Sequence, residues 1–194
     1  MPDTRVSLAF AFLILSRLAY VVGTGYLLVQ QDRHQSSTKR FGLAAGYARF
    51  KRATTTLMVF DTGSFILLNL LTIDTLPLPG PRWGWIVVGA ALGLLGLGVK
   101  AWATRILGPQ AYYWYNFFEP EEPVQWVPRG PYKYLSNPMY GVGYLQTYGL
   151  AVMCASLYGL IGAAFMQICI YVFNEVVEKP HFRALSATKS GAAR

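Results

Sequence analysis

Residues that could do chemistry stand at both ends of one long apolar segment in the last third of the chain. The turn-forming run Asn137-Pro138-Met139-Tyr140 precedes this segment, and Glu175 and Glu178 follow it. Carboxylates can accept a proton, pass it on through water, or hold a cation. The segment has about 35 residues, whereas a helix crosses the apolar part of a bilayer with about 20. We therefore expect the segment to double back, so that Tyr140 and the glutamates meet at one membrane face.

The composition is that of a membrane protein. Of 194 residues, 54% are hydrophobic and 13% are charged, and the mean hydropathy is +0.33, whereas about 25% of residues are charged in a typical soluble domain. The 17 lysines and arginines exceed the 9 acidic residues, but they flank apolar runs, where they set topology and attract anionic lipid. We therefore predict no nucleic-acid partner. Cys154 and Cys169 both lie in the apolar segment, which indicates neither a metal site nor a disulfide framework.

The apolar runs predict an all-α integral membrane protein with five transmembrane helices, the last two forming a helical hairpin. The predicted helices cover about 6–29, 55–76, 83–107, 139–153 and 157–177 of a single membrane domain, 1–194. The proline-rich stretch 77–81 cannot continue a helix and forms a loop. The first run is longer than the apolar region of a signal peptide and lacks a convincing cleavage site, so we expect no cleavable signal peptide.

The distribution of basic residues predicts the orientation of the chain in the membrane. The connection 30–53 carries six basic residues against one acidic residue, whereas the connection after the second helix carries one of each. Because basic residues favour the cytoplasmic side, we place the first connection, the loop 108–137 and the C-terminus there, with the N-terminus outside. An active site at the end of the hairpin would then face the cytoplasm.

Charged residues inside the predicted spans have two interpretations. Asp61 and Lys100 stand at similar depth in the second and third helices and could form a buried ion pair. Alternatively, one of them contacts a lipid phosphate or a cofactor carboxylate, because charges inside a membrane often mark sites. Arg17 has no obvious partner and could extend to the interface or bind a headgroup. Arg49 and Arg52, near the membrane in the basic connection, could also hold a lipid phosphate.

Small and aromatic residues add further candidates. Gly89, Gly93 and Gly96 on the third helix are typical of close helix packing, although glycine also lets a backbone approach a bound cofactor. No strand precedes these glycines, which excludes a dinucleotide-binding fold. The aromatic run after Pro109 includes Tyr113 and Trp114. Such residues favour the membrane interface, and one or two of them could hold a cationic group against a ring face.

The run 134–140, the apolar hairpin and the run 178–182 together resemble the membrane-embedded phospholipid N-methyltransferases, over about residues 102–185, the expected catalytic core. Enzymes of that family make phosphatidylcholine from phosphatidylethanolamine, with S-adenosylmethionine as the methyl donor. The wider group includes isoprenylcysteine carboxyl methyltransferases, which usually have histidine where this chain has Asn137. That difference favours the phospholipid branch.

The resemblance implies roles for particular residues. The residues implied to bind S-adenosylmethionine are Gly96, Gly98, Arg129, Gly130, Tyr132, Asn137, Pro138, Met139 and Glu178. Catalysis is assigned to Tyr140, Glu175 and Glu178. The candidates for binding substrate are Asp61, Lys100, Arg49, Arg52, Tyr113 and Trp114. The family's paired glutamates appear here as Glu178 and Lys179, and Glu175, one helical turn earlier, could replace the missing carboxylate.

The expected reaction is N-methylation of phosphatidylethanolamine or its mono- and dimethyl derivatives, within a bilayer and without a metal. An ammonium group cannot attack until it loses a proton, which Glu175 or Glu178 could accept, and the donor carbon and the amine must be held about 3–3.5 Å apart. The number of methylation rounds and the oligomeric state are left open. Three alternatives also remain open: methylation of an isoprenylcysteine carboxylate, a membrane scaffold without catalysis, and a relative of the NADPH-dependent sterol reductases.

Overall fold

The computed structural model describes residues 3–119 and 129–192, and residues 120–128 of the predicted core lie outside that description. The described part is helical and contains no strand. Its longer elements are α1 (Thr4–His34), α2 (Ser36–Phe41), α3 (Leu43–Leu71), α4 (Arg82–Tyr112), α5 (Leu145–Met153), α6 (Leu157–Phe173) and α7 (Lys179–Ala192). Three short 3₁₀ helices, η1 (Tyr115–Phe117), η2 (Gly130–Lys133) and η3 (Val142–Tyr144), and a π-helical turn, η4 (Asn174–Glu178), join them.

Four helices of the described residues are long and apolar enough to cross a membrane. They are Thr4–His34, Leu43–Leu71, Arg82–Gly108 and Leu157–Leu185. The all-helical membrane class is therefore confirmed. The helix predicted near 139–153 begins with η3 and continues as α5, whose nine residues are too few to cross a bilayer alone. The fifth crossing stays a prediction.

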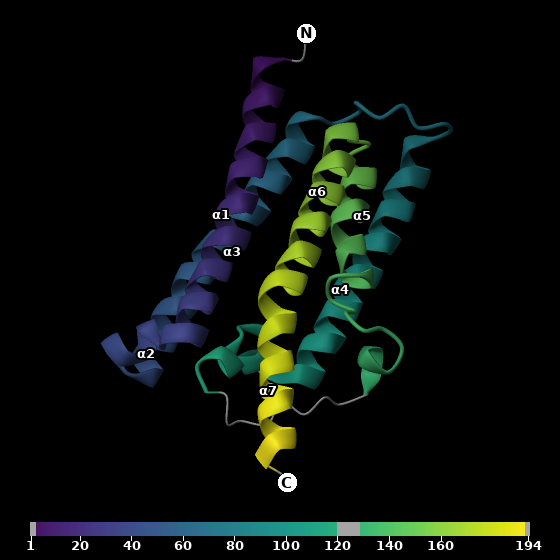
Figure 1. The fold of residues 1–194 in the computed structure, drawn as a ribbon. Helices are drawn as coiled ribbons and strands as arrows, with labels where there is room; N and C mark the ends of the chain where they lie inside the picture. The colour runs from purple at the N-terminus through teal and green to yellow at the C-terminus, as the bar shows by residue number, and fades with distance from the viewer. Residues whose placement is uncertain (1–2, 120–128, 193–194) are drawn as a thin grey trace.

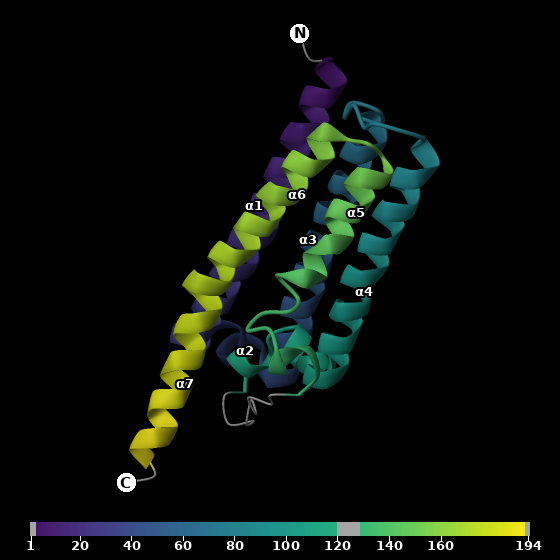
Figure 2. The same ribbon diagram turned by 90° about the vertical axis from the view of Figure 1, so that its right-hand side faces the viewer.

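The helices form one bundle whose two ends differ. The N-terminus, the connection between α3 and α4, and the turn from α5 to α6 gather at one end (Figure 1). The short helix α2, the connection from α4 to α5, and α7 gather at the other end. In the bundle, α1 packs against α3 and α6, and α5 lies between α4 and α6 (Figure 2). The turn 137–140 and Glu178, which carry the candidate catalytic residues, therefore lie at the end of the bundle from which α7 extends.

Three of the membrane helices extend further than their apolar cores predict. The chain was expected to form a loop over 30–53, but α3 already begins at Leu43 and carries Arg49 and Arg52. Hydropathy detects only the residues that contact lipid, whereas Ala, Arg and Lys favour a helix on either side of that zone. Between α1 and α3, the Gln31 side chain accepts hydrogen bonds from Ser37 N and Thr38 N at 3.1 and 3.3 Å. The basic connection is therefore a compact helical turn.

Glycine lets α4 and α5 approach each other closely. A Cβ at Gly149 would lie 2.4 Å from Gly89 O, and a Cβ at Gly96 would lie 2.4 Å from Gln146 N. Both contacts are to backbone atoms, which cannot move aside as a flexible side chain can. The prediction of helix packing from the small residues of the third helix is confirmed, and α5 is the partner.

The last helix passes through a π-helical turn. Hydrogen bonds in η4 span five residues instead of four, so each residue advances less around the axis than in an α-helix. Pro180 stands two residues after the end of this turn. Proline lacks an N–H and clashes with the carbonyl four residues earlier in a regular helix, so the wider turn accommodates it. The helix predicted to end near 177 therefore continues as α7 to Ala192.

Candidate active site

The Glu178 carboxylate is the centre of a small polar site at the end of the bundle that carries α7. Glu178 lies in η4 and is only 8% exposed. Its Oε1 atom accepts a hydrogen bond from the Trp114 indole N–H at 2.5 Å and another from the Tyr140 hydroxyl at 2.7 Å. Both bonds go to one oxygen, and Oε2 has no hydrogen bond from a described residue. The predicted proximity of Tyr140 and Glu178 is confirmed.

A sharp turn after α4 directs Trp114 toward this carboxylate. The backbone of Gly108, inside α4, has φ +82° and interrupts the helix, and Trp114 itself has φ +52°. A bulky residue rarely adopts a positive φ, which costs about 1–3 kcal/mol and persists where the surroundings fix it. Here the indole packs edge-on against Phe50 and Phe173, with ring centres 6.5 and 5.4 Å away. Helices α3 and α6 thus hold the indole in place.

The run Asn137-Pro138-Met139-Tyr140 forms a turn that fixes Tyr140. Asn137 Oδ1 accepts a hydrogen bond from Tyr140 N at 3.4 Å, and the fully buried Pro138 accepts one from Gly143 N at 2.8 Å. From α6, Gln167 Nε2 donates to the Tyr140 carbonyl at 3.0 Å. Asn and Pro are therefore used for their turn chemistry, and the tyrosine is locked from both sides.

The remaining residues of the predicted cofactor set lie around this turn. Gly130 has φ +58°, and a Cβ there would lie 2.9 Å from Trp102 Nε1, so any side chain at this position would be strained. Tyr132 is partly buried, and burial together with the negative charge of Glu178 raises the pKa of its phenol to about 12. Met139 accepts a weak hydrogen bond from Thr104 Oγ1 at 3.8 Å. Arg129 is exposed.

Glu175 does not join Glu178. Its side chain is 56% exposed and forms an ion pair with Lys179. The sequence interpretation assumed α-helical geometry, in which residues three apart share a face. In η4 each residue advances less around the axis, so that when Glu178 faces the bundle, Glu175 faces away. The geometry therefore contradicts the use of Glu175 as a replacement for the second carboxylate.

The two glycines of the Gly-x-Gly element have different surroundings. Gly96 is buried against η3 and α5, where a Cβ would lie 3.0 Å from Gly143 O. Gly98 is exposed, and a Cβ there would meet nothing within 4 Å. Packing therefore accounts for Gly96, and the two residues do not form one surface.

A second polar centre lies deeper in the bundle. Arg17, 2% exposed, donates hydrogen bonds to Asp61 Oδ2 at 2.9 Å, and to Tyr144 OH and Met166 O at 2.5 Å each. The prediction that Asp61 pairs with Lys100 is wrong. The partner of Asp61 is Arg17, because α3 packs mainly against α1, whereas α4 packs mainly against α5. Lys100 instead directs its Nζ toward the Tyr144 ring, 5.1 Å from its centre.

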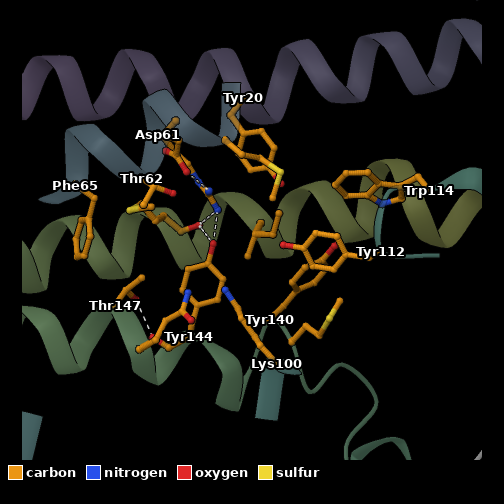
Figure 3. A pocket seen from close by; sticks show the side chains of 16 residues that line it. Tyr20, Asp61, Thr62, Phe65, Lys100, Tyr112, Trp114, Tyr140, Tyr144 and Thr147 are labelled. Carbon is orange, nitrogen blue, oxygen red and sulfur yellow. Dashed lines mark hydrogen bonds and ion pairs between the residues drawn. The ribbon is translucent and has the colours of Figure 1, made fainter. Parts of the chain in front are cut away.

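These residues line a pocket of about 150 Å³ that connects the two centres. Asp61 and Tyr144 lie toward one side of this pocket, and Tyr112 and Trp114 lie toward the other (Figure 3). Tyr140 also lines it, with its hydroxyl bound to Glu178. Burial raises the pKa of the Tyr112 phenol. The pocket therefore joins a charged region to an aromatic region that borders Glu178.

The other predicted substrate residues lie elsewhere. Arg49 and Arg52 line a separate groove of about 470 Å³ on α3, and the Arg49 guanidinium stacks 4.1 Å from the centre of the Phe41 ring. Tyr113 faces Lys51, whose Nζ lies 4.7 Å from the ring centre. None of the three lines the pocket beside Glu178.

Besides the pair of Arg17 and Asp61, sequence reasoning missed a second buried pair. His181, 3% exposed, binds Asp32 at the end of α1 through its Nδ1 atom at 2.7 Å, and its ring stacks on Phe117 with the ring centres 3.7 Å apart. The pair fastens the helix of Glu178 to α1 and η1. The only signal in the sequence was that His181 belongs to the run 178–182.

Comparison with known proteins identifies the family. The family model described as phospholipid methyltransferase matches residues 85–187, which include Lys100, Trp114, Tyr140 and Glu178. The chain belongs to the phospholipid methyltransferase family. The match begins in α4 and ends in α7, so the helices that carry Arg17 and Asp61 lie outside it.

Curated relatives within this family carry a common description. A phosphatidylethanolamine N-methyltransferase of Saccharomyces cerevisiae (strain RM11-1a) is 30% identical over 139 residues, which are 68% of this chain and 15% of the relative. One from Pyricularia oryzae is also 30% identical, over 68% of this chain and 14% of the relative. One from Zygosaccharomyces rouxii is 29% identical over 103 residues. The chain thus matches about one seventh of the length of these relatives. No solved structure matches it significantly.

Proposed function

We propose that the chain transfers a methyl group from S-adenosylmethionine to the amine of phosphatidylethanolamine or of its mono- and dimethyl derivatives, toward phosphatidylcholine. The observation that carries this proposal is the buried Glu178 carboxylate held by Trp114 and Tyr140 in the matched region. Relatives described as phosphatidylethanolamine N-methyltransferases support the substrate class. They favour it over an isoprenylcysteine carboxylate.

The residues around Glu178 suit a cationic methyl donor. Glu178 supplies a negative charge whose Oε2 atom is free to accept a hydrogen bond, and Trp114 and Tyr140 contact it through the indole N–H and the phenol hydroxyl. A carboxylate attracts a sulfonium or an ammonium, and nearby aromatic rings add to that attraction. When bound, S-adenosylmethionine would supply an electrophilic methyl group on sulfur. Of the predicted cofactor residues, we assign this role to Glu178 and to the turn 137–140, with Gly130 and Tyr132 beside them.

The protein must also deliver an uncharged amine. The substrate arrives as an ammonium, which loses a proton to Glu178 directly or through water. The amine nitrogen then bonds to the methyl carbon as the carbon–sulfur bond breaks, and the bonding electrons stay on sulfur. Tyr140 and Trp114 hold the carboxylate on one oxygen and leave the other available for the proton. Positioned general-base catalysis of this kind contributes about 10²–10⁴-fold.

We further propose how the chain is placed in the membrane. The end of the bundle with α2 and Glu178 carries the basic residues of the first connection, so the positive-inside tendency places it in the cytoplasm. Figure 1 has the N-terminus and the turn from α5 to α6 at the opposite end. The stretch from Tyr140 through α5 then forms the fifth membrane crossing and is buried against α4 and α6. Because α5 alone is too short to cross, the turn 137–140 provides the remaining length of this crossing.

The test is incubation of the purified chain with labelled S-adenosylmethionine and, separately, each of the three amine lipids. We expect label in the lipid, and we expect Glu178→Gln to lower kcat at least 100-fold. Because glutamine keeps an oxygen that accepts from Trp114 and Tyr140, this variant should fold. Asp74→Asn, which changes an exposed carboxylate at the opposite end of the bundle, is the matched control and should leave kcat unchanged. Absence of labelled lipid in every arm would contradict the proposal.

A further inference from the structure

The deep pocket holds one more positive charge than negative charge. Its charged lining residues are Arg17, Lys100 and Asp61. Asp61 accepts a hydrogen bond from Arg17, so those two charges compensate each other. Lys100 has no hydrogen bond or ion pair with a described residue, and its ammonium lies over the Tyr144 ring, 5.1 Å from the ring centre. A charge among apolar helices is costly unless an opposite charge joins it. The pocket is therefore complementary to an anion.

A glycine next to the Lys100 side chain makes room for its ammonium in the pocket. A Cβ at Gly143 would lie 2.8 Å from Lys100 Cγ and 3.3 Å from Lys100 Cε. The Lys100 side chain thus passes over Gly143, where the lack of a Cβ leaves room for it. Figure 3 shows Lys100 extending toward Tyr144. A ligand for this pocket therefore needs an anionic group that pairs with Lys100.

We propose that this pocket binds the phosphoethanolamine headgroup of the lipid, with the phosphodiester on Lys100. This inference rests on the proposed function and adds the place where the acceptor lipid is recognised. A cavity of about 150 Å³ holds a group about the size of benzene or slightly larger. A phosphoethanolamine group meets that limit, whereas S-adenosylmethionine is several times too large.

The orientation follows from the two sides of the pocket. With the phosphate on Lys100, the amine extends along the wall formed by Tyr140 toward the side with Tyr112 and Trp114. That side borders Glu178, which Tyr140 and Trp114 both contact. The headgroup therefore lies between the residue that neutralises its phosphate and the residue proposed to accept its proton.

The kinetic test compares Lys100→Met with Lys100→Arg. Loss of a hydrogen bond to a charged group predicts that Lys100→Met raises the KM for the lipid about 10- to 100-fold, while kcat changes little and the affinity for S-adenosylmethionine, measured by calorimetry, does not change. Lys100→Arg keeps the charge and should recover most of the affinity for the lipid. Lys39→Met, which removes an exposed lysine on α2, is the matched control and should have no effect.

A binding test separates this inference from the proposed function. Dihexanoyl phosphatidylethanolamine should raise the Tm of the wild-type chain in detergent more than dihexanoylglycerol, which lacks the phosphate, because a ligand of the folded state stabilises it. Lys100→Met should lose that difference and, without lipid, should melt no lower than the wild type. If the wild type shows the difference yet methylates no lipid, the proposed function fails and the headgroup site stands.

Two outcomes would overturn the inference. A weaker affinity for S-adenosylmethionine in Lys100→Met, with an unchanged KM for the lipid, would assign the lysine to the carboxylate of the methyl donor. No change in either quantity, with no lipid-dependent difference in Tm, would leave Lys100 without a ligand. Gly143→Ala offers an independent variant, because its methyl group displaces the lysine stem, and it should raise the KM for the lipid in the same direction.

Discussion

Breaking the buried ion pair between Arg17 and Asp61 should destabilise the chain strongly, whereas removing both charges should not. Arg17→Met leaves the Asp61 carboxylate, 4% exposed, without a cation within hydrogen-bond distance. It also removes the donors to Tyr144 OH and Met166 O. Loss of one partner of a buried pair costs about 3–5 kcal/mol. For a chain of this size, 1 kcal/mol corresponds to about 2–4 °C in Tm, so the expected decrease is roughly 6–20 °C.

The double variant Arg17→Met with Asp61→Leu removes the charge that the single variant exposes. Replacing both members of a buried pair by apolar residues is often neutral or stabilising, so its Tm should return to within a few degrees of the wild type. The assay is thermal unfolding of the four proteins of the double-mutant cycle in one detergent, followed by circular dichroism.

A second double-mutant cycle, with Lys100→Met in place of Arg17→Met, distinguishes the observed pair from the one that depth alone indicates. If Asp61 were paired with Lys100, Lys100→Met would cost as much as Arg17→Met and would couple to Asp61→Leu. The structure predicts that Lys100→Met leaves Tm unchanged or higher, because it removes an unpaired charge. If Lys100→Met coupled to Asp61→Leu more strongly than Arg17→Met does, the packing of α1 against α3 around Asp61 would be refuted.

Three further predictions address the rest of the molecule. Gly149→Ala should lower Tm by several degrees, because its Cβ would lie 2.4 Å from the backbone oxygen of Gly89 and must separate α4 from α5; Gly98→Ala, with nothing within 4 Å, is the control. Glu175→Gln should change kcat less than twofold, since that carboxylate is exposed and bound to Lys179; a loss as large as that of Glu178→Gln would reverse the assignment. His181→Ala should lower Tm, because it removes a buried ring and the partner of Asp32 and costs about 2–4 kcal/mol; an unchanged Tm would show that the pair does not fasten the two helices.

The proximity of Tyr140 and Glu178 could be predicted from the sequence because the prediction needed only the length of the apolar segment between them. An apolar segment too long for one crossing and too short for three must bring its ends together, and the Asn-Pro turn fixes where it starts. The identity of the third partner could not be obtained in this way. Trp114 reaches Glu178 through a left-handed backbone at its own position, and an aromatic run in a sequence does not reveal which ring turns inward.

The errors arose where helix neighbours and helix type had to be assumed. Asp61 and Lys100 were paired because they stand at similar depth in the second and third helices, but α3 packs against α1, and α5 is the partner of α4. Glu175 was placed beside Glu178 because α-helical spacing was applied to five residues that form a π-helical turn. The neighbours of a helix and the type of its turns depend on tertiary packing, and hydropathy and residue spacing carry little information about that packing.

The turn from Asn137 to Tyr144 determines how the two polar centres are related. Tyr140 contacts Glu178, and Tyr144, four residues later, contacts Arg17 and faces Lys100. The hydrogen bond from Gly143 N to Pro138 O closes the turn that carries Tyr140 and ends beside Tyr144, so one short piece of backbone sets the separation of the centres. Under the proposed function, methylation enlarges the amine and leaves the phosphate unchanged. A fixed anchor at the phosphate would then return each successive amine to the same place beside Glu178, which is what repeated methyl transfer in one pocket requires.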